Sequence, residues 1–190
     1  MNAYVLVLFL HVLGAIGLFV GLVLEGFVLA RLRSADSAEQ VRFFARAIGR
    51  LKVVYIPSFV GALLGGIYLG SVVGSAATLW IAVSLGAFVI LMLIGGLVTG
   101  IQMARLDAML KAETVDFSAV KARANTKALL AAYGVRAGIA LGILFLMTTK
   151  PDLILSLVAV AAGAFLGLTL ALMPRQLTCT FPQQVTGGAK

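Results

Sequence analysis

The stretch AYVLVLFLHVLGAIGLFVGLVLEGFVLA, residues 3–30, decides the fold class of this chain. His11 and Glu25 are the residues in it that can carry a charge near neutral pH. A helix needs about 20 apolar residues to cross the ~30 Å hydrocarbon core of a bilayer. The run is too long for a cleaved signal peptide, and no Lys or Arg precedes Arg31. It therefore predicts a transmembrane helix.

Four further apolar runs have the same character. They cover residues 53–73, 78–103, 128–149 and 152–173. Every backbone amide in lipid needs a partner within the protein, so each run is predicted to be helical. Charged residues make up 12% of the chain, against roughly 25% in a soluble domain. We therefore expect an all-α membrane bundle of five transmembrane helices. It forms a single domain, residues 1–175, followed by a flexible tail, residues 176–190.

The positions of the basic residues predict the orientation of the bundle. Most Lys and Arg lie in the connections 31–52 and 104–127, whereas the connections 74–77 and 150–152 are neutral or nearly so. Basic connections stay on the cytoplasmic side of a membrane. We therefore expect a multi-pass protein of a cell inner membrane, with the N-terminus outside and the tail in the cytoplasm. This pattern accounts for the net charge of +8, and nucleic acid is not an expected partner.

The first basic connection predicts a helix of its own. Residues 34–39 offer capping side chains with acidic residues among them, as at helix starts. Apolar residues then recur at near-helical spacing among arginines, at Val41, Phe43, Phe44, Ala47, Ile48 and Leu51. This pattern is typical of an amphipathic helix lying at the membrane surface, here leading into the second span.

Rows of glycine at four-residue spacing predict close packing of the helices. They are Gly61 and Gly65, then Gly66, Gly70 and Gly74, then Gly134, Gly138 and Gly142, and finally Gly163 and Gly167. Lipid supplies no hydrophobic force between helices, so association relies on close contact and on hydrogen bonds. The rows predict a tight bundle. They leave open a homo-oligomer or a larger membrane complex joined through the same faces.

Three ionisable side chains within the runs are the candidate site residues, because such groups usually face the interior of a bundle. His11 and Glu25 are fourteen residues apart, which places them within about 40° of each other on one helix face. Arg136 lies in the fourth run. At 1.5 Å per residue, Glu25 and Arg136 lie ~8 Å and ~12 Å from the inner boundary, so we expect them to interact directly or through water.

The pair Glu25 and Arg136 has three interpretations. It is a structural ion pair that sets helix register, or a site for a charged ligand or a proton, or two side chains that separately reach the inner surface. His11 also has three: a hydrogen bond to a neighbouring helix, a ligand of haem iron, or a proton relay. A second axial ligand for a haem b would come from Met92, Met103, Met147 or His11 of a second copy. Beyond His11 as a haem ligand, no metal ligand is predicted.

The chain carries no recognisable motif of a catalytic reaction. We find no phosphate-binding loop, no pair of Cys or His at metal-site spacing, and no nucleophile beside a base. The residues therefore favour a non-catalytic accessory or ligand-binding subunit with a polar site inside the membrane. A b-type haem redox protein using His11 is the second hypothesis. A small proton- or anion-coupled transporter is the third.

The segment Leu10-His11-Val12-Leu13-Gly14-Ala15-Ile16-Gly17-Leu18-Phe19 resembles the first helix of several small bacterial membrane protein families. It is most similar to membrane proteins of the DUF2269 type. The copper-resistance D type and the HemJ type of protoporphyrinogen oxidase begin similarly, and the HemJ resemblance implies a haem-linked role for His11. The chain lacks the Trp and Pro-Arg of HemJ-like chains, and the further histidines or Met-rich motif of copper handling. The resemblance covers one helix and the layout of spans, and it implies no activity.

Overall fold

The computed structural model describes residues 2–73, 78–112 and 116–173, and within them every regular element is a helix. The elements are α1 (Ala3–Arg33), α2 (Ala38–Arg50), α3 (Lys52–Val73), α4 (Thr78–Ile94), the π-helix η2 (Gly95–Gly100), α5 (Ile101–Lys111), α6 (Phe117–Ala124), α7 (Lys127–Thr149) and α8 (Leu153–Leu172). The prediction of a flexible tail at residues 176–190 falls outside the described residues.

Five helical stretches are long and apolar enough to cross a membrane. They are Ala3–Arg33, Ala38–Val72, Leu79–Lys111, Phe117–Thr149 and Leu153–Leu172. The predicted all-α bundle of five transmembrane helices is therefore confirmed. The third stretch continues to Lys111, beyond the predicted end of its apolar run, because α4, η2 and α5 follow one another without a break.

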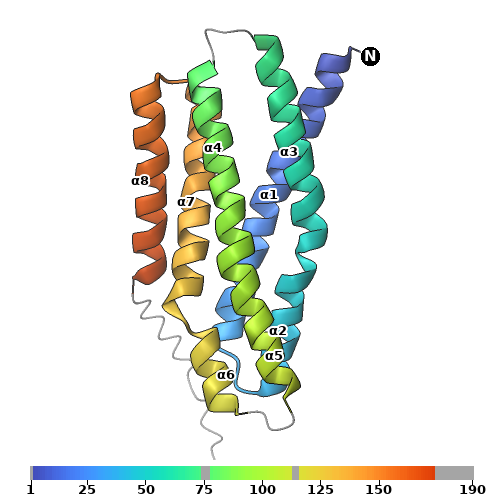
Figure 1. Ribbon diagram of the computed structural model, residues 1–190, viewed down its shortest axis with the longest axis vertical. Helices are drawn as coiled ribbons and strands as arrows, with labels where there is room; N and C mark the ends of the chain where they lie inside the picture. The colour runs from blue at the N-terminus through green and yellow to red at the C-terminus, as the bar shows by residue number, and fades with distance from the viewer. Residues whose placement is uncertain (1, 74–77, 113–115, 174–190) are drawn as a thin grey trace, which may run out of the picture.

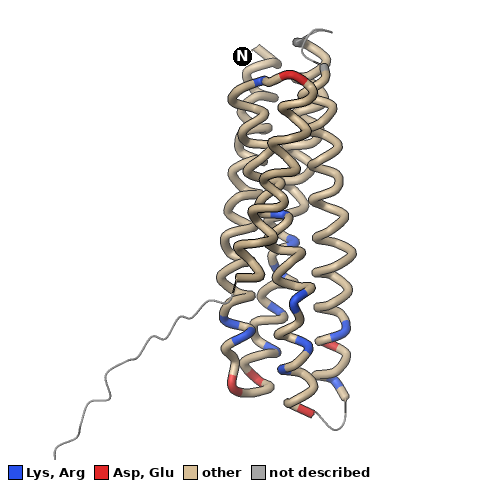
Figure 2. Tube along the Cα trace, turned by 90° about the vertical axis from the view of Figure 1, so that its left-hand side faces the viewer, with Lys and Arg blue, Asp and Glu red and all other residues tan. Residues whose placement is uncertain are grey.

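The two ends of the bundle differ in charge. The helices run side by side, with α1 and α3 on one side, α7 and α8 on the other, and α4 between them (Figure 1). Lys and Arg gather at the end formed by α2, α5 and α6, far from the N-terminus (Figure 2). We name this the basic end. We name the opposite end, where α1 begins and where α7 connects to α8, the N-terminal end.

The amphipathic helix predicted in the first basic connection is α2, and its apolar face packs against protein. Ser37 caps the helix by accepting a hydrogen bond from the backbone N–H of Gln40, at 3.2 Å. Val41, Ala45 and Ile48 of α2 are buried against α1, α5 and α6. A buried cluster thus closes the basic end below the spans, and α2 continues into α3 across a single residue. The apolar side of α2 is thus covered by protein, and its position at the membrane surface stays a prediction.

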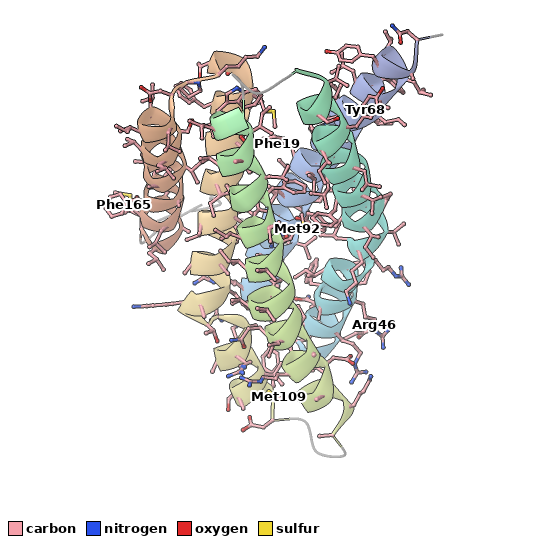
Figure 3. The ribbon with its side chains drawn as sticks, turned by 45° about the horizontal axis from the view of Figure 1, so that its top comes forward. Phe19, Arg46, Tyr68, Met92, Met109 and Phe165 are labelled. Carbon is pink, nitrogen blue, oxygen red and sulfur yellow. The ribbon has the colours of Figure 1, made fainter. Side chains whose placement is uncertain are left out.

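Apart from Gly74, which lies outside the described residues, the predicted glycine rows pack within the chain. A Cβ on Gly138 would collide with the carbonyl oxygen of Gly163, and one on Gly134 would collide with that of Gly167. The backbones of α7 and α8 therefore meet directly, as small residues allow. Apart from this contact α8 is covered by little else, and Phe165 points away from the bundle (Figure 3).

A second close contact joins α1 to α3. A Cβ on Gly14 would lie 2.6 Å from the backbone nitrogen of Ala62, and one on Gly65 would lie 2.8 Å from Cβ of His11. Because these glycines are engaged inside one chain, self-association through the same faces would require the contacts between helices to open. An oligomer, if one forms, is expected to use other surfaces.

Candidate functional site

A buried ion pair lies in the middle of the bundle. Nη1 of Arg136 on α7 donates a hydrogen bond to Oε1 of Glu25 on α1, at 2.6 Å. Glu25 is 1% exposed and Arg136 is 3% exposed. The structure thus brings together two of the three candidate residues, in direct contact. A charge-assisted hydrogen bond of this kind offsets part of the cost of removing both charges from water.

Tyr55 on α3 completes this polar cluster. Its hydroxyl donates to the second carboxylate oxygen of Glu25, Oε2, at 2.6 Å. The guanidinium carbon of Arg136 lies 5.5 Å from the centre of the Tyr55 ring, within the range of a cation–π contact. Gly21 makes room for the ring, since a Cβ there would lie 2.9 Å from it. We refer to Glu25, Arg136 and Tyr55 as the triad.

Tyr55 was not among the candidate site residues predicted from the sequence. No spacing within one helix points to it, because it meets its partners from a different helix. The signal that could have found it is chemical. A buried carboxylate needs donors for both of its oxygens, and Arg136 donates to Oε1. A search for a second donor among the hydroxyls of neighbouring spans would have included Tyr55.

The π-helix η2 makes room for the Arg136 side chain. A Cβ on Gly95, the first residue of η2, would lie 2.9 Å from Cζ and 3.0 Å from Nε of Arg136. The guanidinium group therefore lies directly on the backbone of this turn. Turns of π-helix inside longer helices occur frequently at functional sites. The sequence analysis did not predict this irregularity, and adjacent glycines do not by themselves mark it, because Gly65 and Gly66 lie in the regular α-helix α3.

Polar atoms without a protein partner continue from the triad toward the basic end. Within the described residues, Nε of Arg136, Oγ1 of Thr99 and Oε1 of Gln102 are buried and make no hydrogen bond. Thr99 and Gln102 follow Gly95 in η2 and α5, toward the basic end. Burying a polar atom without a partner costs free energy. This side of the triad is therefore unusually polar for a membrane interior.

An apolar cleft opens above the triad, on the side of the N-terminal end. Its volume is about 270 Å³, and α1, α3, α4 and α7 form its walls. Tyr4, Trp80 and Lys150 line its part at the N-terminal end, which we call its mouth, and Tyr55 lines its opposite part, which we call its floor. Phe19 projects into the interior between the helices (Figure 3). Its other lining residues are mainly aliphatic or aromatic and include Leu8, Leu18, Leu63, Leu85, Phe88 and Ile143.

His11 lines this cleft and is not part of the triad. The distance from its Nδ1 to the carbonyl oxygen of Ala62 is 2.8 Å, so Nδ1 carries the proton of this hydrogen bond. The ring nitrogen left for a ligand is Nε2. Fourteen residues separate His11 from Glu25 along α1, about 21 Å at 1.5 Å per residue. The structure therefore places the third candidate residue in a different environment from the other two.

The three methionines considered as partners of His11 lie in different places. Met147 lines the same cleft as His11. Met92 packs against the apolar cluster around Leu22 and Leu91. Met103 belongs to the buried cluster of the basic end. Of these three, Met147 is the one that shares a cavity with His11.

Comparison with known proteins places the chain in a family. The sequence model of the family described as "Predicted integral membrane protein (DUF2269)" matches residues 5–151. The chain belongs to the DUF2269 family. The predicted resemblance to this family is confirmed, and the chain is an integral, multi-pass membrane protein. No curated protein and no solved structure matches this DUF2269 protein.

The matched region contains the residues of the site. The triad, His11 and Lys150 all lie within residues 5–151 of this DUF2269 protein, whereas α8 lies outside the match. Chemically, the arrangement joins an apolar cavity with one accessible imidazole to a charged cluster that closes its floor. No three His, Cys, Asp or Glu side chains gather as metal ligands in the part of the chain that the structure describes. The mainly aliphatic and aromatic lining of the cleft suits an apolar or amphipathic molecule.

Proposed function

We propose that this protein is a non-catalytic binding subunit that takes an apolar or amphipathic molecule from the bilayer into the cleft. The observation that carries the proposal is the cleft itself, whose walls are mainly apolar from Tyr4 and Trp80 at its mouth to Tyr55 at its floor. Ligand sites typically combine apolar walls with a few polar groups that orient the ligand. His11 supplies such a group partway along the cleft.

The triad acts in this proposal as the rigid floor of the site. Glu25, Arg136 and Tyr55 connect α1, α7 and α3, which are three of the four cleft walls. Truncating one member of a buried ion pair leaves the other charge unpaired, so the three helices are held in a single arrangement. A fixed spacing of the walls favours one shape of ligand over others.

The proposal includes the orientation of the bundle. We place the basic end in the cytoplasm and the protein in a cell inner membrane, because basic connections are retained on the cytoplasmic side. The cleft mouth then faces the outer leaflet. Among the described residues, the other Lys and Arg lie at the basic end or, for Arg136, inside the bundle, so Lys150 is the basic residue at the mouth (Figure 2).

Native mass spectrometry of the detergent-purified chain tests the proposal. The wild type is expected to retain a small apolar molecule from the membrane. Ala15→Phe fills the cleft from α1 and is expected to lose that molecule. Ala30→Phe, on the exposed face of the same helix, is the matched control and is expected to keep it. Equal retention by the wild type and Ala15→Phe would contradict the proposal.

A haem in the cleft is the second candidate function. It is favoured by the fixed Nδ1 of His11, which leaves Nε2 available, and by Met147 in the same cleft. A histidine that ligates a metal usually donates its other ring N–H to a carbonyl or carboxylate. The test is the absorption spectrum of purified protein expressed with ample haem, before and after reduction. A Soret band that is lost in His11→Ala supports this candidate, and a featureless spectrum in the wild type rules it out.

A further inference from the structure

Lys150 is placed at the mouth of the cleft by an unusual backbone conformation. It ends α7 with φ 49° and ψ 54°, in the left-handed region. Among the described residues other than glycine, it is the one with a positive φ. Glycine is the usual residue in this conformation after a helix, since it has no Cβ to strain. A lysine here gives up some stability, and Lys150 is among the residues that line the cleft.

The charge of Lys150 is free for a ligand. Within residues 2–73, 78–112 and 116–173, its side chain makes no ion pair or hydrogen bond. The nearest acid along the chain, Asp152, caps α8 by accepting the backbone N–H of Leu155 at 2.8 Å. A lysine at the C-terminal end of a helix also interacts favourably with the helix dipole. That interaction does not depend on whether the lysine lines a cleft. Its place among the lining residues is the added observation.

The lining of the cleft extends along much of α1. The α1 residues that line it run from Tyr4 to Leu22, which corresponds to ~27 Å at 1.5 Å per residue. This length approaches the ~30 Å thickness of the hydrocarbon core. Between these residues the walls are mainly aliphatic and aromatic. An apolar cleft of this length with one cation at its mouth is complementary to an amphiphile with one anionic head.

We propose that the ligand of the cleft is an anionic amphiphile, whose carboxylate or phosphate pairs with Lys150 and whose hydrocarbon chain extends toward Tyr55. This inference rests on the proposed binding function and names its ligand class. The source is either a free fatty acid or one chain of an anionic phospholipid, which share this chemistry. In both cases the amphiphile enters from the leaflet at the N-terminal end.

Binding of matched amphiphiles to the full chain tests the inference. Oleate is compared with oleyl alcohol, and dioleoyl phosphatidylglycerol is compared with dioleoyl phosphatidylcholine, by native mass spectrometry in a neutral detergent. The variants are Lys150→Gln, Ala15→Phe and, as matched control, Lys127→Gln. Lys127 is an exposed lysine at the opposite end of α7. A partly exposed charge pair predicts about a three- to fivefold loss of anionic binding in Lys150→Gln.

The outcomes separate the ligand class from the function. The inference holds if the wild type prefers the anionic member of either pair and Lys150→Gln loses that preference while Lys127→Gln keeps it. The pair that responds identifies the source. If Lys150→Gln and Lys127→Gln bind the anionic amphiphiles equally well, the inference is overturned. The binding function still stands in that case, provided that Ala15→Phe abolishes binding of both the anionic and the neutral amphiphile. Undiminished binding to Ala15→Phe overturns both.

Discussion

Arg136 and Glu25 are 111 residues apart in the sequence, and their side chains meet with Nη1 2.6 Å from Oε1. The contact joins α7 to α1 directly below the floor of the apolar cleft. It lies against the π-helix η2, whose first residue, Gly95, leaves space for the guanidinium group. The buried pair thus contacts both the helices that form two of the cleft walls, α1 and α7, and the π-helical turn η2.

Removing one charge of this pair is expected to destabilise the protein strongly. Glu25→Leu leaves Arg136 charged and unpaired, which typically costs about 3–5 kcal/mol. Glu25→Leu combined with Arg136→Leu removes both charges and is expected to cost far less. Thermal unfolding in detergent, followed by the fluorescence of Trp80, measures both variants. Similar losses for the single and the double variant would show that the charges are not coupled.

The hydroxyl of Tyr55 is expected to contribute stability through its bond to Glu25. Tyr55→Phe removes one donor to a buried carboxylate, which costs about 1.5–3 kcal/mol. Tyr68→Phe, on the same helix and exposed, is the control and is expected to change stability by less than about 0.5 kcal/mol. The measurement is the unfolding midpoint of each variant. Equal effects would place the contribution of Tyr55 in its ring and not in its hydroxyl.

Two neighbouring glycines of η2 are expected to respond in opposite directions to alanine. A Cβ on Gly95 would lie 2.9 Å from the Arg136 guanidinium, which Glu25 holds in place, so Gly95→Ala should cost about 1–3 kcal/mol. A Cβ on Gly96 meets nothing within 4 Å. Gly96→Ala should therefore stabilise the helix by about 0.5–1 kcal/mol. Unfolding midpoints that change in the same direction for both variants would contradict the close contact between Gly95 and the Arg136 guanidinium.

Thr99 offers a test of the polar region below the triad. Its hydroxyl is buried, with the residue 6% exposed, and it has no hydrogen-bond partner within the described residues. Thr99→Val replaces it with a methyl group and is expected to raise stability by about 1 kcal/mol. Thr148→Val is the control, because that hydroxyl donates to the carbonyl of Phe145 at 2.9 Å. A marked loss of stability in Thr99→Val would indicate that its hydroxyl is satisfied.

Cysteine labelling tests the proposed orientation. In a chain with Cys179→Ala, a single cysteine is introduced either at Thr149, exposed at the N-terminal end, or at Ser34, exposed at the basic end. With the basic end in the cytoplasm, a membrane-impermeant maleimide should label Thr149→Cys in intact cells. It should label Ser34→Cys only after the cells are permeabilised. The reverse pattern would invert the orientation and place the cleft mouth in the inner leaflet.

The number and type of the spanning helices were determined by the sequence alone. Lipid offers backbone amides no partners, so an apolar run of sufficient length such as residues 3–30 must be helical whatever surrounds it. The contact between Glu25 and Arg136 was also predictable. The rise per residue of a helix gives the depth of each side chain in the membrane from its position in the sequence. Two charges at similar depth in lipid are strongly favoured to pair.

Only the tertiary structure decided which helix faces meet. The outside of a membrane bundle is as apolar as its inside, so hydrophobic periodicity does not mark the buried side of a span. Tyr55, the π-helix at Gly95 and the cleft around His11 therefore had no signal in spacing along one helix. Their geometry comes from direct backbone contacts such as Gly14 with Ala62 and Gly138 with Gly163, which depend on how separate helices fit together.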